Sequence, residues 1–206
     1  MFRYEVGIPH PETQFLDYVG FCWNSYKCSI PDEKTAMSIE ATTFMLDLIN
    51  NIGKRTQILD LGSGWTSAAL RLYQKYVDPT VNITSVGTDT FWMIKTLEYL
   101  ECIRVGIGKV LMWDQLLEDD SQFDFIVLDI DSTAKRHLYF NHVVDKIKDG
   151  ATIIFDDMHK TTLRANLHAI LISHFTFRWI EGVKTRDEYG RYACAAMDVR
   201  RKSNAD

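Results

Sequence analysis

The chain has 206 residues and a mass of 23.8 kDa, the size of one ordinary domain with at most a small extension. Hydrophobic residues make up 46% and charged residues 25% of the sequence, which excludes a disordered, collagen-like or fibrous protein. The net charge of −5 disfavours nucleic acid as the main partner, because proteins that grip many phosphates need a basic face.

Other features of the sequence bear on its compartment. No apolar run approaches the roughly 18 residues of a membrane span, and the N-terminal segment MFRYEVGIPHPETQF lacks the apolar core of a signal peptide. The four cysteines are widely separated and form no Cys-x-x-Cys pair, which favours reduced thiols. We therefore expect a cytoplasmic protein without a membrane segment that acts on a small molecule; a homodimer remains open.

The predicted elements begin with an irregular segment. Residues 1–34 are interpreted as an N-terminal extension or lid with some helix, whose aromatic side chains either close over a site or pack against the core. Residues 35–53 are predicted to be helical, because Met45, Leu48, Ile49 and Ile52 recur at helical spacing.

Strands and helices then alternate. Apolar runs predict strands at 57–61, 81–86, 109–113, 123–129 and 151–155. Helical spacing of apolar residues predicts helices between them, and the helix after 123–129 is expected to end at Gly150. Residues 175–183 and 189–199 read as an antiparallel hairpin, followed by a polar tail at 200–206.

This order predicts an α/β fold. Five strand–helix repeats imply a doubly wound, mostly parallel sheet with helices on both faces. The terminal hairpin completes a seven-stranded, Rossmann-like sheet with an antiparallel edge.

Acidic residues follow every predicted parallel strand. In open α/β sheets, ligands bind beyond the carboxyl ends of the strands, so these side chains should gather around one site. They are Asp60, Asp89, Asp114, Asp129 with Asp131, and Asp156 with Asp157.

The first strand runs into a glycine loop, Gly62-Ser63-Gly64, directly before a helix. Glycine allows positive φ and close approach of a ligand to the backbone. Thr66 stands where a G-x-G-x-G series would continue, and Ser67 replaces the third glycine of the G-x-G-x-x-G dinucleotide pattern, so an NAD-binding oxidoreductase is disfavoured. A tight turn without a ligand is the alternative.

The segment Ile58–Ser67 resembles motif I of the class I S-adenosylmethionine-dependent methyltransferases, and the strand plan over about residues 35–199 is similar to their sheet. Within that family, Met37-Ser38-Ile39-Glu40 and the Asp129, Asp156-Asp157 arrangement most resemble the small catechol O-methyltransferase-like group. The resemblance implies a methyltransferase-like domain at 35–199 that uses S-adenosylmethionine.

The resemblance also implies roles for individual residues. The glycine loop would face the methionine part of the cofactor, and Asp129 would lie beside the transferred methyl group. Gly87 stands where an acid usually binds the ribose, which leaves Asp89 as the substitute. Carboxylates suit the ammonium, diol and amine of this cofactor. The implied cofactor-binding residues are Asp60, Gly62, Ser63, Gly64, Asp89, Trp113, Asp114 and Asp129.

A metal and a base are the remaining expectations. Asp129, Asp156 and Asp157 are predicted to hold Mg²⁺ or another divalent cation, because hard cations prefer oxygen ligands. The alternative is that Asp129 contacts cofactor or substrate directly while Asp156-Asp157 caps the next helix. Ser132 replaces the group's catalytic lysine. Asp129 and His159 are therefore the candidate catalytic residues, with His159 as general base.

The sequence thus predicts methyl transfer to a hydroxyl of a small molecule, with metal assistance open. An amine, carboxylate or peptide acceptor is one alternative. A non-catalytic binding protein that keeps the fold is another.

Overall fold

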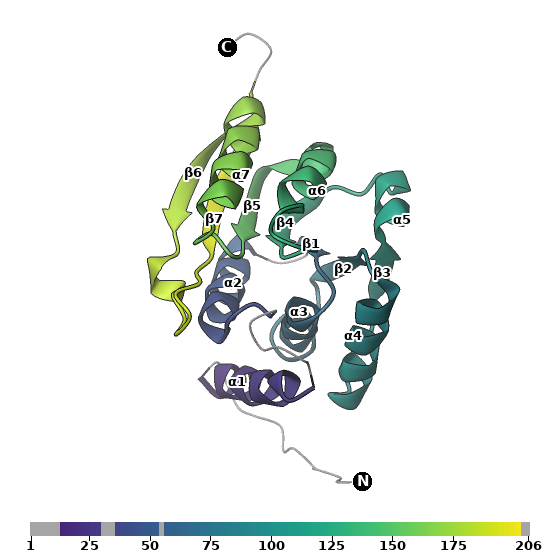
Figure 1. Ribbon diagram of the computed structural model, residues 1–206. Helices are drawn as coiled ribbons and strands as arrows, with labels where there is room; N and C mark the ends of the chain where they lie inside the picture. The colour runs from purple at the N-terminus through teal and green to yellow at the C-terminus, as the bar shows by residue number, and fades with distance from the viewer. Residues whose placement is uncertain (1–12, 30–35, 54–55, 203–206) are drawn as a thin grey trace.

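The computed structural model describes residues 13–29, 36–53 and 56–202. A seven-stranded sheet in the order β3-β2-β1-β4-β5-β7-β6 forms its centre (Figure 1). Strands β1 to β5 are parallel, and β7 pairs antiparallel with both β5 and β6, as predicted. The strands are β1 (Gln57–Leu61), β2 (Asn82–Gly87), β3 (Lys109–Met112), β4 (Phe123–Leu128), β5 (Ile147–Phe155), β6 (Phe175–Glu181) and β7 (Cys194–Arg201).

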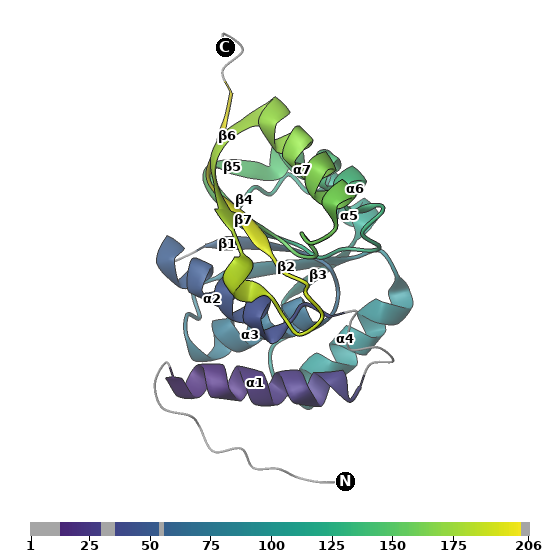
Figure 2. The ribbon, with the colours of Figure 1, turned by 60° about the vertical axis from the view of Figure 1, so that its left-hand side comes forward.

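Helices cover both faces of the sheet (Figures 1 and 2). In Figure 1, α2, α3 and α4 lie below the strands and α5, α6 and α7 above them. None of the helices in the described part of the chain is long and apolar enough to cross a bilayer. They are α1 (Thr13–Lys27), α2 (Ile39–Ile52), α3 (Trp65–Tyr76), α4 (Thr90–Cys102), α5 (Trp113–Glu118), α6 (Arg136–Val143) and α7 (Thr161–His174), with short 3-10 turns η2 (Val144–Lys146) and η3 (Val183–Thr185).

The strands divide their side chains between two hydrophobic cores. In β1, Ile58 packs with α2 and α3, whereas Leu59 and Leu61 belong to the core under α6 and α7. Alternate residues of a strand point to opposite faces, and a parallel sheet covered on both faces is apolar throughout. This is why mostly apolar runs mark β1, β4 and the second half of β5.

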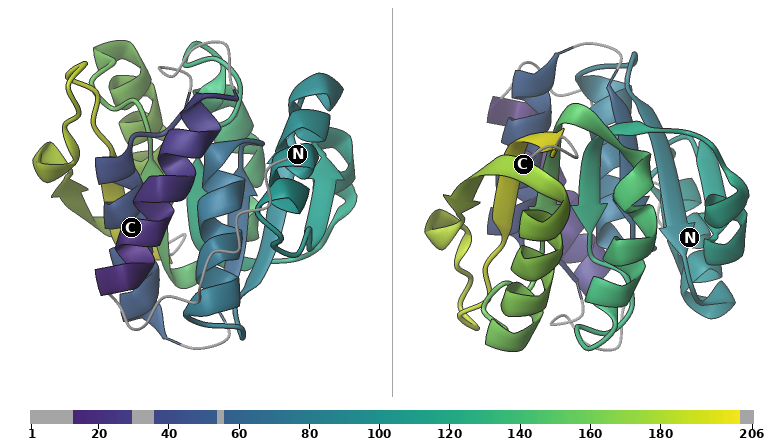
Figure 3. Two further views of the ribbon diagram at one scale, coloured as in Figure 1. Left: turned by 90° about the horizontal axis from the view of Figure 1, so that it is seen from below. Right: turned by 90° about the horizontal axis from the view of Figure 1, so that it is seen from above.

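Helix α1 is built into the first of these cores. Its residues Val19, Cys22, Trp23 and Tyr26 are buried with α2 and α3, and Figure 3 (left) shows α1 crossing the outer side of both helices. The Tyr99 hydroxyl of α4 donates a 2.6 Å hydrogen bond to the Cys22 carbonyl. Trp23 and Tyr26 therefore pack into the core, as one of the two alternatives expects, and Tyr26 also lines the cavity described below. Residues 1–12 and 30–34 of the predicted extension lie outside the described residues.

Several predicted boundaries are wrong. The helix expected to end at Gly150 ends at Val143 and is followed by the short turn η2. Strand β5 then begins at Ile147, which pairs with Phe123. Gly150 lies inside the strand with φ +85° at a register irregularity, because a bulge needs the conformational freedom of glycine. The prediction was wrong because Ile147, the first residue of β5, happens to fit the apolar spacing of the helix before it.

Smaller corrections concern strand ends. Trp113, predicted to end the third strand, begins α5. The last two strands are joined by a longer connection than expected, since β6 ends at Glu181 and β7 begins at Cys194. Arg200 and Arg201, assigned to the polar tail, pair with Thr176 and Phe175 in the sheet.

Gly182, at the end of β6, should not tolerate a side chain. An added Cβ would lie 1.6 Å from the Ala193 carbonyl oxygen, and this atom belongs to the backbone and cannot turn aside. We expect Gly182→Ala to lower the free energy of unfolding in urea by about 3 kcal/mol or more. The control is Gly20→Ala, where a Cβ meets nothing within 4 Å of it and the helix should gain about 0.5–1 kcal/mol. Equal stabilities of the two variants would contradict this packing.

Candidate active site

A cavity of about 650 Å³ opens at the carboxyl ends of β1, β2 and β4, within the usual range for small-molecule sites. The glycine loop forms its floor, and the start of α4 and the turn between β4 and α6 form its walls. It is lined by Tyr26, Ala36, Gly62, Ser63, Gly64, Trp65, Thr66, Thr88, Asp89, Trp92, Asp129, Ile130, Asp131, Ser132, Lys135, Arg136 and Tyr139.

The glycine loop packs directly against the end of β4. A Cβ at Gly62 would lie 2.8 Å from the Asp129 carbonyl oxygen, and Gly62 has φ +148°. Gly64, with φ +158°, begins α3 without a side-chain cap. All three loop residues line the cavity, and the cofactor contact predicted for Gly62, Ser63 and Gly64 stays a prediction.

Asp60 lies beneath this loop, fully buried, and is not among the described residues that line the cavity. Its carboxylate accepts hydrogen bonds from the hydroxyls of Thr66 (2.8 Å), Ser67 (2.5 Å) and Ser85 (2.6 Å). Burial raises the pKa of Asp60, and these hydroxyls and Arg71 oppose the rise. The carboxylate thus ties α3 and β2 to the loop from inside, and its contact with a cofactor stays a prediction.

At the end of β2, a side chain at Gly87 would crowd Met93 and Ser63. A Cβ there would meet Met93 Cε at 2.9 Å and Ser63 Oγ at 3.1 Å. Asp89 instead lines the cavity and is exposed. Its Oδ1 accepts a 3.0 Å bond from the Trp92 amide and caps α4, which leaves Oδ2 outside the cap. The structure therefore places a carboxylate at this wall, two residues after the expected position.

Trp113 and Asp114 are set back from the cavity. Neither is among its described lining residues. The Trp113 ring packs against Tyr139 with ring centroids 4.6 Å apart, and Tyr139 does line the cavity. Trp113 thus supports the wall from behind, and the predicted adenine contact of both residues is untested.

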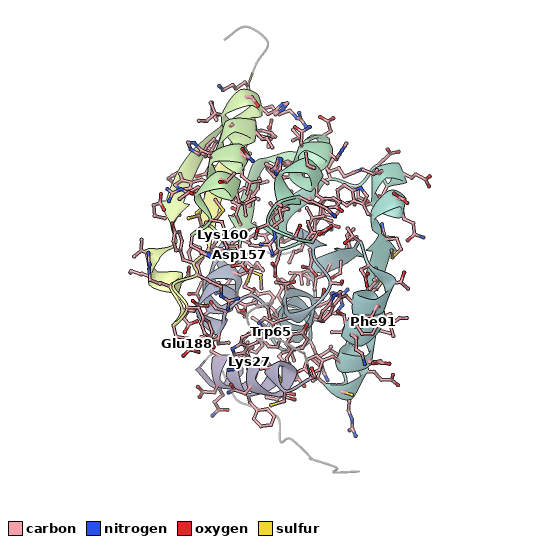
Figure 4. The ribbon with its side chains drawn as sticks, in the orientation of Figure 1. Lys27, Trp65, Phe91, Asp157, Lys160 and Glu188 are labelled. Atoms are coloured by element: carbon pink, nitrogen blue, oxygen red, sulfur yellow. The ribbon has the colours of Figure 1, made fainter. Side chains whose placement is uncertain are left out.

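The carboxylates of Asp129, Asp156 and Asp157 converge as predicted, with one oxygen of each within 4.8 Å of the others. Asp157 has φ +60°, a left-handed conformation that a non-glycine residue adopts at some cost. Figure 4 shows Asp157 above Trp65, which marks the start of α3. Helix α7 begins after Lys160 without a side-chain cap, so the alternative in which Asp156-Asp157 caps it is wrong.

Arg136 is the residue of this cluster that the sequence reasoning missed. Its Nη2 lies 2.7 Å from Asp129 Oδ1 and its Nη1 lies 3.1 Å from Asp157 Oδ2. Its Nε donates to the Ile130 carbonyl at 3.1 Å, and the residue is 5% exposed. The available signal was an arginine in the first turn of a helix, where acidic residues are favoured.

Burial shapes the protonation of the cluster. It raises the pKa of Asp129 well above its usual range and that of Asp156 to about 6, and the neighbouring carboxylates add to both shifts while Arg136 opposes them. Burial also acts to lower the pKa of Arg136, but the three carboxylates outweigh it and the pKa is raised. Arg136 therefore stays charged.

His159 lies on the far side of Asp157, with Nδ1 3.7 Å from Asp157 Oδ1. Burial lowers its pKa, opposed by the charge of Asp157, so the imidazole is neutral near pH 7 and able to accept a proton. It is not among the described lining residues of the cavity. Its role as general base remains a prediction.

The turn after β4 brings further polar groups to the cavity. Asp131, with φ +50°, accepts a 2.9 Å hydrogen bond from the Tyr139 hydroxyl and lies 3.5 Å from Lys135 Nζ. Ser132, which stands in place of the group's lysine, and Lys135 both line the cavity. Lys135 therefore brings an ammonium group to the cavity three residues after position 132.

The chain is similar in structure to several solved methyltransferases. A Podospora anserina methyltransferase bound to S-adenosylhomocysteine is 14% identical, with 91% of this chain and 88% of that chain covered and a TM-score of 0.66. The O-methyltransferase TomG of Streptomyces achromogenes, in complex with S-adenosylmethionine, is 16% identical (92% and 91% covered, TM-score 0.64). An O-methyltransferase of Bacillus cereus in complex with S-adenosylhomocysteine is 15% identical (91% and 92%, 0.66). No protein-family model and no curated protein matches the sequence. The chain has the fold of these enzymes.

Asp156 should make stability depend on pH. Because its pKa rises from 3.8 to about 6 on folding, the native state holds a proton that the unfolded chain releases between about pH 4 and 6. This contribution is complete below about pH 4 and lost as the pH rises through about 6. Asp156→Asn should flatten that slope and raise the free energy of unfolding near pH 7.5 by on the order of 1–3 kcal/mol.

The control for this measurement is Asp145→Asn. The Asp145 side chain is 94% exposed, so this exchange should change the free energy of unfolding little. A less stable Asp156→Asn protein near pH 7.5 would show that the ionised carboxylate supports the fold.

Proposed function

We propose that the protein is an S-adenosylmethionine-dependent methyltransferase that acts on a hydroxyl group of a small molecule. The observation that carries this proposal is the bare glycine loop packed against Asp129 at the floor of a 650 Å³ cavity. The neighbouring structures with S-adenosylmethionine or S-adenosylhomocysteine share the fold around this position. An intracellular, cytoplasmic location and an acceptor other than nucleic acid belong to the same proposal.

The donors and acceptors of the cavity suit this cofactor. A phosphate-binding loop would favour lysine or arginine, and the loop Gly62-Ser63-Gly64 holds neither. Its backbone can accommodate an amino-acid group. Asp89 lines the cavity and uses Oδ1 for the helix cap, so its Oδ2 would accept hydrogen bonds from the ribose diol. Trp92 offers an aromatic face on the same wall.

When bound, the cofactor supplies a methyl group on a cationic sulfur. Transfer is an in-line displacement, so the protein acts mainly by holding donor and acceptor in line. Asp129 is fixed at the cavity by Gly62 on one side and Arg136 on the other. The acceptor hydroxyl must lose a proton, and His159 beside Asp157 is the group we assign to receive it.

Calorimetric titration with S-adenosylhomocysteine tests the cofactor class. We expect micromolar binding by the wild-type protein, and at least a tenfold loss in Gly62→Ala, because a methyl group there must displace the Asp129 carbonyl. Gly106→Ala is the control, since a Cβ at Gly106 meets nothing within 4 Å. Absence of binding by folded wild-type protein would overturn the proposal in favour of a non-catalytic protein with this fold.

The role of Asp89 can be separated from its role as a helix cap. Asparagine caps helices as well as aspartate does, so Asp89→Asn keeps the bond to the Trp92 amide and the melting temperature. The exchange replaces Oδ2 by a donor, and the affinity for S-adenosylhomocysteine should fall about tenfold, or about 1.4 kcal/mol. Unchanged affinity at unchanged stability would remove Asp89 from the ribose site.

A further inference from the structure

The methyltransferase group that the sequence resembles implies a divalent cation among Asp129, Asp156 and Asp157. The three carboxylates converge, which is the donor set such a cation prefers. The guanidinium of Arg136, however, lies among them and is paired with two of the three. The residues present therefore do not fit a divalent cation in addition to this side chain.

The geometry of the pairs supports this conclusion. Asp129 Oδ1 is 2.7 Å from Nη2 and Asp157 Oδ2 is 3.1 Å from Nη1, so one oxygen of each carboxylate already faces a positive charge. Mg²⁺ requires its oxygen ligands at about 2.0–2.1 Å in octahedral geometry. A cation at the centre of the cluster would meet the guanidinium at a distance where like charges repel strongly.

Hydrogen bonds hold the guanidinium at Nε and Nη2, while the buried Nη1 faces Asp157 as an ion pair without a hydrogen bond. Its Nε donates to the Ile130 carbonyl at 3.1 Å, and the Arg136 side chain is 6% exposed. Displacing it would leave a buried charge without its partners, which is costly. A planar fork that bridges two carboxylates is a geometry that arginine provides and lysine does not.

A second arginine contributes from the other side. The positive charge of Arg191 acts on Asp156 and Asp157, while its Nε lies 2.7 Å from Asp187 Oδ2. Positive charge thus reaches the cluster from α6 and from the connection between β6 and β7.

We propose that Arg136 takes the place of the divalent cation: its guanidinium bridges Asp129 and Asp157 at the edge of the cavity, and the protein works without a divalent metal ion. This inference rests on the proposed function for its role in methyl transfer. Arg136 is then a positioning residue, which fixes the Asp129 carboxylate beside the glycine loop as a bound metal would.

Titration with Mn²⁺, followed by electron paramagnetic resonance of the free ion, tests the proposal. We expect wild-type protein to bind Mn²⁺ no more tightly than about 1 mM. Arg136→Ala uncovers three carboxylates and should bind it at least about tenfold more tightly. The matched control is Arg178→Ala, which removes an arginine from a surface pair with Asp198 and should bind as weakly as the wild type.

Two outcomes would overturn the proposal. One is tight Mn²⁺ binding by the wild type that is lost in Asp157→Asn. The other is a folded Arg136→Ala protein that gains no affinity for Mn²⁺. If Arg136→Ala does not fold alone, Arg136→Lys keeps one charge but cannot bridge both carboxylates, and Mn²⁺ should raise its melting temperature and leave that of the wild type unchanged.

Calorimetry on the same samples keeps this proposal separate from the proposed function. Wild-type affinity for S-adenosylhomocysteine should be equal with and without Mg²⁺. If the wild type does not bind S-adenosylhomocysteine at all, the proposed function fails. The Mn²⁺ titration would still show whether Arg136 or a metal ion neutralises the three carboxylates.

Discussion

The close contact between Gly62 and the backbone of Asp129 is the constraint on which the site depends. Only 2.8 Å would separate a Cβ at Gly62 from the Asp129 carbonyl oxygen. Hydrogen bonds fix the same junction, because the Asp129 amide donates to Leu61 at 2.8 Å and the Gly62 amide donates to Val86 at 3.0 Å. The ends of β1, β2 and β4 are thereby held together, and the glycine loop and Asp129 lie side by side at the cavity.

Much of the fold could be predicted because its signals are local. The buried strands are mostly apolar runs, and the acids at their carboxyl ends mark the sheet edge where ligands bind. The orientation of Asp60 is harder to predict, since an acidic side chain at a strand end can point toward the ligand site or into the protein interior. Asp60 has the same parity as Ile58, which packs under α3, so alternation along β1 already directs it toward the hydroxyls of α3 and away from the cavity.

The missed features depend on contacts between distant residues. Arg136 reaches Asp129 across an irregular turn with no periodicity. Nothing in the sequence around Arg136 indicates that it also pairs with Asp157, which follows β5. The start of β5 was hidden because Ile147 fits the helical spacing before it and is claimed for the sheet only by pairing with Phe123. Such competition between local pattern and tertiary pairing is settled by the pairing.

The aromatic residues around the cavity join it to the first hydrophobic core. Tyr26 packs with Trp65, their ring centroids 5.8 Å apart, and Trp65 packs with Trp23 at 5.3 Å, while Tyr26, Trp65 and Trp92 also line the cavity. Two of the five tryptophans of the chain, Trp65 and Trp92, therefore line the cavity, and two more, Trp23 and Trp113, pack against lining residues. The protein carries its own optical reporter: a ligand that enters the cavity changes the polarity and quenching around these indoles, so its arrival can be followed in the intrinsic fluorescence of the unlabelled chain.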